Sequence, residues 1–263
     1  MNKKTNLSNR AINLLKSDNV TWFKWYVLGI WESDFKPYFA IWEAFASCME
    51  SWAKTWDYNL EWISHIMEKQ FFDNQATDED LINAVVSLQE AINNVQVLDL
   101  PRPQEAEKEI IIELNENYNL KVRFDAFYGD YILDHKAVSA FTKSEDADEK
   151  YGQQMRLYQY AWYKQTGQKL PAYIQEVKKA RASVPADLKK EDLEKLIPED
   201  KREDYKTVSD MKDYLRMHPL KEWVWNRIEF ERKDELVWEI EDLLNRAMKK
   251  ADYLRTLSLE DVL

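Results

Sequence analysis

Apolar side chains recur at intervals of three and four positions through the first hundred residues of the chain. The spacing is clear in WFKWYVLGIW, YFAIWEAFASCMESWAKTW, NLEWISHIMEKQFF and DEDLINAVVSLQEAINNV, and it is typical of helices with one buried face. We therefore predict that residues 1–100 form a helical N-terminal part that packs on the remainder of the protein. Pro101 and Pro103 end this part, because proline disrupts a helix interior.

The pattern then changes to β-branched residues that alternate with polar ones. The segments KEIIIELN, NLKVRFDAF and YILDHKAV follow one another with short polar connections, which indicates a three-stranded meander. Residues 150–166 predict a helix that ends at Gly167, and PAYIQEVKKA predicts a further strand. A charged stretch at about 181–220, a strand in EWVWNRIEF and a long amphipathic helix complete the chain.

The third strand segment carries charged residues in its middle, Asp134 and Lys136 among them. If Gly129 and Asp130 form a two-residue hairpin loop, Asp125 of the second segment lies directly opposite Asp134. The same register gives mostly apolar pairs on the other, buried face, namely Phe124 with His135 and Ala126 with Leu133. If side chains alternate strictly, the face that carries Asp125 and Asp134 also carries Arg123, Phe127, Ile132 and Lys136.

Two carboxylates about 5 Å apart on neighbouring strands repel each other and need a cation. A divalent ion would satisfy Asp125 and Asp134, since magnesium binds one or two protein carboxylates and keeps waters for a phosphate substrate. Lys136 would then orient a water or stabilise developing charge. The alternative is an ordinary cross-strand network of these residues with Arg123 on a solvated face, and the spacing alone does not decide between the two.

The wider pattern resembles the PD-(D/E)XK nuclease superfamily, within its RecB-type and phage exonuclease branch. The matching features are Asp125 in VRFDAF, the D-x-K of ILDHKAV, and Gln154 to Tyr158 in QMRLY, followed by another strand. The resemblance covers roughly residues 107–180. It implies an α/β (α+β) fold with a restriction-endonuclease-like core of order αβββαβ. That core would occupy residues 101–263, with the charged stretch as an insertion and a C-terminal helix.

The resemblance also implies roles for these residues. Asp125 and Asp134 would be metal ligands, together with the backbone carbonyl of His135, and the cofactor would be Mg²⁺ or Mn²⁺. Lys136 would be the catalytic lysine. Gln154 and Tyr158 lie one helical turn apart, so both can face the active site or the DNA.

Members of this branch usually add a histidine or glutamate from an upstream helix. His65 is the one upstream histidine in the sequence, and it is the first candidate. Five glutamates are the alternatives, Glu43, Glu50, Glu61, Glu68 and Glu90. One departure from the family pattern is Ala137, which stands where a threonine or serine often follows the lysine and removes a contact to substrate.

Composition narrows the field of functions. The formal net charge of −11 over 263 residues argues against a protein that coats DNA by charge alone. A single cysteine, Cys48, excludes an internal disulfide and the iron–sulfur subgroup of the family. The sequence has no apolar run of membrane-spanning length and no visible secretory signal, so we expect no membrane contact and a cytoplasmic location.

The resemblance implies a metal-dependent deoxyribonuclease, in particular a phage-type recombination exonuclease. DNA is the expected partner, and the resemblance adds a phage single-strand annealing protein and self-association into a homo-oligomer. The alternatives are a catalytically inactive module of the same fold that binds nucleic acid or a protein, and a structural or host-interaction protein. A local basic patch for DNA would draw on Lys143, Lys150, Lys178, Lys179 and Arg181.

Overall fold

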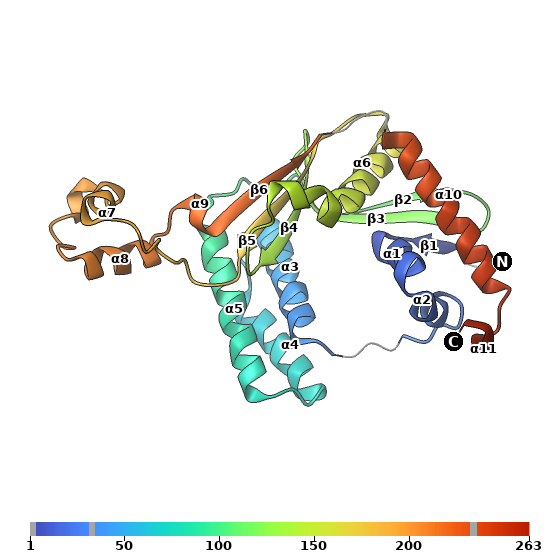
Figure 1. Cartoon of the computed structure of the whole chain (residues 1–263), viewed down its shortest axis with the longest axis horizontal. Coiled ribbons are helices and arrows are strands. Elements are labelled where there is room, and N and C mark those ends of the chain that lie inside the picture. Colours follow the sequence, from blue (N-terminus) through green and yellow to red (C-terminus); the bar gives the residue numbers. More distant parts are fainter. Residues whose placement is uncertain (1–3, 32–34, 232–235, 263) are drawn as a thin grey trace.

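A six-stranded mixed sheet forms the centre of the protein (Figure 1). The computed structural model describes residues 4–31, 35–231 and 236–262. The strands are β1 (Thr5–Leu7), β2 (Glu105–Glu113), β3 (Tyr118–Phe127), β4 (Ile132–Val138), β5 (Ala172–Lys178) and β6 (Trp225–Phe230). Their order is β1-β3-β4-β5-β6, with β2 paired to β3. β1 runs parallel to β3 and β4 parallel to β5, while the remaining pairs are antiparallel.

β3 is shared between three neighbours. β2 pairs with one edge of β3 along most of the length of β3. The other edge of β3 pairs with β1 over Tyr118–Leu120 and with β4 only at Ala126 and Phe127. The β3–β4 register is the predicted one, since Ala126 pairs with Leu133. The hairpin loop closes with a hydrogen bond from the Tyr128 amide to the Tyr131 carbonyl, 3.1 Å. β3 and β4 therefore separate immediately beyond this hairpin, and Asp125 stands where they part.

Helices cover both faces of the sheet (Figure 1). One layer packs on an apolar core that includes Trp22, Phe124, Ile132 and Ile174, and consists of α1 (Asn9–Ser17), α2 (Asn19–Tyr26), α6 (Gln153–Thr166) and α10 (Leu236–Arg255). The other layer packs on a second core with Phe45, Ala137 and Val177, and consists of α3 (Pro37–Thr55), α4 (Leu60–Asp73) and α5 (Asp78–Gln96).

The chain order of β2, β3, β4, α6 and β5 confirms the predicted meander, helix and strand. α6 ends as expected at Gly167, whose φ of 72° is the left-handed conformation that glycine adopts readily. A single π-helical turn, η2 (Asp148–Gly152), precedes it. The overall α+β architecture is thus the one that the sequence pattern predicts.

The first hundred residues do not form one helical body. Thr5–Leu7 is a strand of the sheet, and the segment through α2 contributes to the core that holds α6 and α10. α3 to α5 contribute to the core on the opposite face. The N-terminal part therefore supplies helices to both faces of the sheet and packs on both of them.

The charged stretch between β5 and β6 forms an arm that stands away from the sheet at the left of Figure 1. It holds α7 (Lys190–Leu196), a 3-10 turn η3 (Glu199–Lys201) and α8 (Val208–Met217), and leads into α9 (Lys221–Val224). The arm has its own small apolar cluster of Leu193, Ile197, Met211 and Leu215. After α10, the short α11 (Leu259–Val262) ends the described chain. Within the three described segments, no helix combines the length and the apolar character needed to cross a membrane.

Candidate active site

The side-chain alternation of β3 breaks at Asp125. Phe124 and Phe127 both contact Trp162, with ring centroids 6.4 and 4.5 Å away, although residues three apart in a regular strand point to opposite faces. The β2–β3 ladder is interrupted at this level, since Ala106 pairs with Ala126 and Lys108 with Phe124. Between them on β2, Glu107 has a φ of 51°, in the left-handed region. Both strands therefore kink at this level. The prediction that Phe124 and Phe127 lie on different faces was wrong, because it assumed unbroken alternation.

The kink turns the Asp125 carboxylate toward β4. Its Oδ2 accepts a hydrogen bond from the backbone amide of His135, 2.7 Å. In a continuous pair of strands, a backbone carbonyl of β3 would accept from such an amide. Here the strands separate, and the Asp125 side chain is the acceptor. Burial raises the pKa of Asp125 well above its usual range, and the neighbouring Asp134 raises it further, while Lys136 and the His135 amide act in the opposite direction. The structure thus brings the two carboxyl groups into mutual repulsion across β3 and β4.

Asp134 is held in one orientation by partners from two directions. Its Oδ1 accepts hydrogen bonds from Gln154 Nε2, 3.1 Å, and from the Tyr158 hydroxyl, 3.0 Å, while Lys136 Nζ forms an ion pair with Oδ2. Gln154 Nε2 also lies 2.6 Å from the Tyr158 hydroxyl oxygen. Asp134 is only 1% exposed, so these contacts fix a carboxylate that is almost removed from solvent.

Lys136 and Tyr158 keep their protons in this environment. Burial lowers the pKa of Lys136, but the charges of Asp134 and Asp125 outweigh that effect and the net shift is upward. Burial raises the pKa of Tyr158 well above its usual range, and the two aspartates raise it further. At neutral pH the cluster therefore contains one ammonium group and one phenol that serve as hydrogen-bond donors.

The structure adds Glu107, which sequence reasoning missed. Its side chain pairs with Arg123 Nε at 2.8 Å and is 15% exposed. Burial raises the pKa of Glu107, Arg123 lowers it, and Glu50 and Asp134 raise it. The signal that could have found Glu107 is the register of the first hairpin, which sets it opposite Asp125. Of the five upstream glutamates considered, Glu50 on α3 is the one whose charge acts on this carboxyl.

His65 lies elsewhere on the protein. Its side chain on α4 is 79% exposed and stands 3.5 Å from Glu68. It lines a hollow formed by α4 and the turn before it, together with Asp57, Glu61 and Trp62. The structure therefore places His65 on a separate surface from the strands that carry Asp125 and Asp134.

The donors of the cluster fit a hard divalent cation by their chemistry. Glu107, Asp125, Asp134 and the carbonyl of His135 are all oxygen ligands, which Mg²⁺ and Mn²⁺ prefer. In the part of the chain that the structure describes, no three His, Cys, Asp or Glu side chains are gathered closely enough to hold an ion. Lys136 instead supplies the positive charge next to Asp134.

A second buried carboxylate, Glu176, lies beside Lys136 in the β4–β5 register. It is fully buried and accepts hydrogen bonds from the Thr142 amide, 2.8 Å, the Thr142 hydroxyl and the Tyr151 hydroxyl, 2.7 Å. Lys150 Nζ lies 3.5 Å away. Glu176 therefore anchors the chain that leaves β4 and enters the turn before α6, the helix that carries Gln154 and Tyr158.

We expect Glu176→Gln to lower the free energy of unfolding at pH 7 by about 1–3 kcal/mol, because donors that now meet a carboxylate would be left with weaker acceptors. Burial raises the pKa of Glu176, but hydrogen bonds from Thr142 and Tyr151 outweigh it and the net shift is downward. The stabilisation is therefore present above the unfolded pKa and is lost as the pH falls through the lower folded pKa. Urea unfolding at pH 7 and near pH 4 measures the loss. Glu149→Gln, at an exposed site, is the control.

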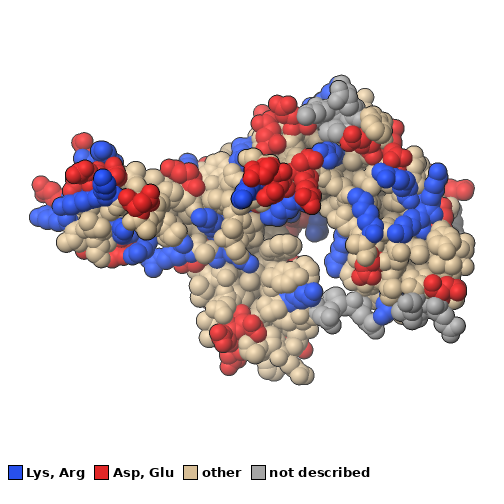
Figure 2. All heavy atoms as spheres, in the orientation of Figure 1, with Lys and Arg blue, Asp and Glu red and all other residues tan. Residues whose placement is uncertain are grey.

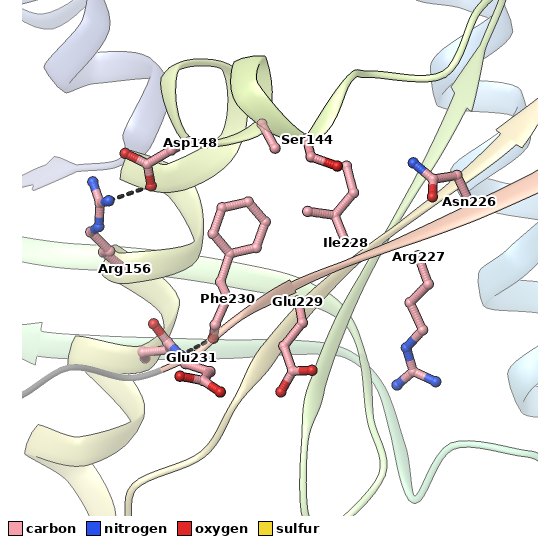
Figure 3. Close-up of a pocket in the computed structure, with 11 residues that line it drawn as sticks. Ser144, Asp148, Arg156, Asn226, Arg227, Ile228, Glu229, Phe230 and Glu231 are labelled. Atoms are coloured by element: carbon pink, nitrogen blue, oxygen red, sulfur yellow. Dashed lines mark hydrogen bonds and ion pairs between the residues drawn. The ribbon is translucent and has the colours of Figure 1, made fainter.

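A different hollow lies at the edge of the sheet, along β6 (Figure 3). Its walls come from the turns before α6, from α6 itself and from residues 226–231. Arg156 pairs with Asp148 there, and Gln159 Nε2 donates to the Phe230 carbonyl, 2.8 Å. These polar groups already satisfy one another, and the hollow is formed by a different set of residues from the carboxylate cluster.

Comparison with known proteins gives a likeness of fold. No family model matches the chain, and no curated protein matches its sequence. Among solved structures, a protein from Eubacterium rectale named "Putative exonuclease" superimposes with a TM-score of 0.54 at 11% sequence identity, over 95% of this chain and 81% of that one. At this identity the likeness establishes a shared α+β fold.

Proposed function

We propose that this protein is a metal-dependent nuclease of the PD-(D/E)XK type that hydrolyses DNA phosphodiester bonds. The observation that carries the proposal is the arrangement around Asp134. This buried carboxylate is bound by Lys136 on one side and by Gln154 and Tyr158 on the other, with Asp125 next to it. The exonuclease name of the protein that shares the fold supports the same class of reaction.

The finer part of the proposal follows from the sequence resemblance. It assigns the protein to the RecB-type and phage exonuclease branch, with a recombination role, a phage single-strand annealing protein as partner, self-association and a cytoplasmic location. Asp125, Asp134 and the His135 carbonyl would hold Mg²⁺ or Mn²⁺. We add Glu107, whose pKa Asp134 and Glu50 raise, to the acidic groups that would act on that ion. Such an ion neutralises charge on a scissile phosphate and promotes ionisation of the attacking water.

The protein's own residues have distinct parts in this chemistry. Lys136 keeps its proton and can donate hydrogen bonds to the phosphate or to the nucleophile as negative charge develops. Gln154 and Tyr158 fix Oδ1 of Asp134, which leaves the orientation of the carboxylate set before substrate arrives. The His135 amide does the same for Asp125. This preorganisation is what positions reacting groups without further loss of entropy.

Degradation of linear duplex DNA tests the proposal. We expect cleavage that requires Mg²⁺ or Mn²⁺, stops in excess EDTA, and is lost in Asp134→Asn. That substitution keeps the volume of the side chain and removes the charge. Circular dichroism checks that the variant is folded. Cleavage by Asp134→Asn at the wild-type rate, or undiminished cleavage in chelator, would contradict the proposal.

The inactive module is the second candidate, and one observation favours it. Lys136 already neutralises Asp134, as a purely structural ion pair would. Calorimetric titration with Mn²⁺ separates the two candidates. An active nuclease should bind the ion at a site that Asp134→Asn removes, whereas an inactive module should show no such site.

A further inference from the structure

A groove lined by cations and aromatic rings opens beside the candidate active site. Its walls come from β1, α1, α2 and the middle of β2 and β3, and it also includes Gln154 and Tyr158 of α6. Its volume is about 1130 Å³. The same two α6 side chains hydrogen-bond to Asp134, so the groove borders the carboxylate cluster.

One wall of the groove is a stack of aromatic rings. Trp25 and Trp31 lie with ring centroids 5.3 Å apart and planes inclined by 25°. The Arg10 guanidinium lies 4.4 Å from the Trp25 centroid, and Tyr26 meets Trp31 edge-on. Trp31 nevertheless remains 66% exposed. An indole that is held by its neighbours and open to solvent is a stacking surface for an unpaired base.

The charge of the groove is opposite to that of the whole protein. Its lining has four cations, Lys4, Arg10, Lys121 and Arg123, and one carboxylate, Glu109, in a chain of net charge −11. Three of these cations also pair with carboxylates: Lys121 with Glu109 at 2.6 Å, Lys4 with Glu113 at 2.7 Å and Arg123 with Glu107 at 2.8 Å. Arg10 lies over the Trp25 ring. Figure 2 shows blue Lys and Arg side chains over α1, the helix that carries Arg10, and further ones over α10, which does not line the groove. Such a local excess of cations attracts a phosphate backbone.

The reacting groups are recessed, which favours a flexible ligand. Asp134 is 1% exposed and the Lys136 side chain 26% exposed. Duplex DNA keeps its bases stacked on one another, whereas a single strand can turn its bases onto protein rings and follow a groove with its phosphates. We propose that this groove binds single-stranded DNA and leads it to Asp134, with Trp31 stacking on a base and Arg10 and Lys121 contacting phosphates. This inference rests on the proposed nuclease function for the fate of the strand.

The test is the affinity for an end-labelled oligodeoxythymidine, measured by fluorescence anisotropy in EDTA so that the strand stays intact. Trp31→Ala should weaken binding by roughly 5- to 150-fold, which is the contribution of one base stacked on an aromatic ring. Trp62→Ala is the matched control, because Trp62 is a tryptophan of similar exposure, 64%, on α4. Its Kd should equal that of the wild type.

Salt dependence tests the phosphate contacts separately. For a single strand, each neutralised phosphate contributes about 0.7 to the slope of log K against log salt concentration. Arg10→Gln should therefore lower that slope by about 0.7, whereas Arg216→Gln on the α7–α8 arm should leave it unchanged. A blunt duplex should compete less well than unlabelled oligodeoxythymidine at equal nucleotide concentration.

Three results would overturn the inference: wild-type affinity in Trp31→Ala, equal losses in Trp31→Ala and Trp62→Ala, or tighter binding of the duplex. These outcomes are separable from the fate of the proposed function. If the Trp31→Ala protein cleaves DNA and binds a single strand as the wild type does, the inference about the groove is rejected and the proposed nuclease function stands. If single-strand binding depends on Trp31 but the protein cleaves no DNA with any metal, the inference about the groove stands and the proposed nuclease function is rejected.

Discussion

Replacing Lys136 by methionine should reduce DNA cleavage by about 100- to 1000-fold, which is the usual cost of removing one donor from developing charge. The same change should destabilise the protein by about 3 kcal/mol, because Asp134 would remain buried without its ion-pair partner. Methionine keeps the length and apolar stem of the lysine, so the effects report the ammonium group. Single-turnover cleavage and urea unfolding measure the two losses.

The matched control for this prediction is Lys195→Met, on α7 of the arm, where the lysine side chain is 76% exposed. It should change neither the cleavage rate nor the free energy of unfolding. Mn²⁺ should raise the melting temperature of Lys136→Met more than that of the wild type, because a divalent ion can replace the missing positive charge beside Asp134. A Lys136→Met protein that cleaves DNA at the wild-type rate would refute the catalytic assignment of this lysine.

Replacing Glu107 by glutamine should have opposite effects on stability and on metal affinity. Partial burial raises the pKa of Glu107 most, Arg123 lowers it, and Glu50 and Asp134 raise it. Because the net shift is upward, neutralisation of Glu107 should stabilise the metal-free protein by about 1 kcal/mol. If Glu107 helps to hold the ion, its loss should weaken Mn²⁺ binding by about 10- to 100-fold. Calorimetric titration and urea unfolding give the two quantities.

The control for Glu107 lies two residues further along β2. Glu109 also forms an ion pair across to β3, with Lys121 at 2.6 Å, but its side chain is 40% exposed. Glu109→Gln should therefore leave metal affinity and stability almost unchanged, because exposed ion pairs contribute little. If Glu107→Gln binds Mn²⁺ as tightly as the wild type, Glu107 has no part in holding the ion.

The sequence predicted the hairpin of β3 and β4 well, for a clear physical reason. Alternating apolar residues and a two-residue loop at Gly129 together fix a register, and the observed pairing of Ala126 with Leu133 is the predicted one. The predicted pairs beyond it, Asp125 with Asp134 and Phe124 with His135, do not form, because the two strands separate there, and Asp125 reaches β4 through its side chain. The helix with Gln154 and Tyr158 was equally predictable, because its apolar spacing and its glycine stop are local features of the chain.

The kink at Asp125 could not be predicted in the same way. It depends on a left-handed conformation at Glu107, which a glutamate adopts only where its surroundings impose it. β1 was missed because three residues carry too little alternation to separate a strand from a helix end. Which of the five upstream glutamates comes near Glu107 depends on which helix passes the sheet edge. That is a property of tertiary packing, and the spacing of residues along the sequence does not indicate it.

The arm between β5 and β6 has a consequence for how this fold can vary. β5 and β6 are antiparallel neighbours, and strands so related can be joined by a two-residue turn. The arm is therefore not needed to connect these two strands. Because it has its own apolar cluster, its length can change while β5 and β6 stay paired.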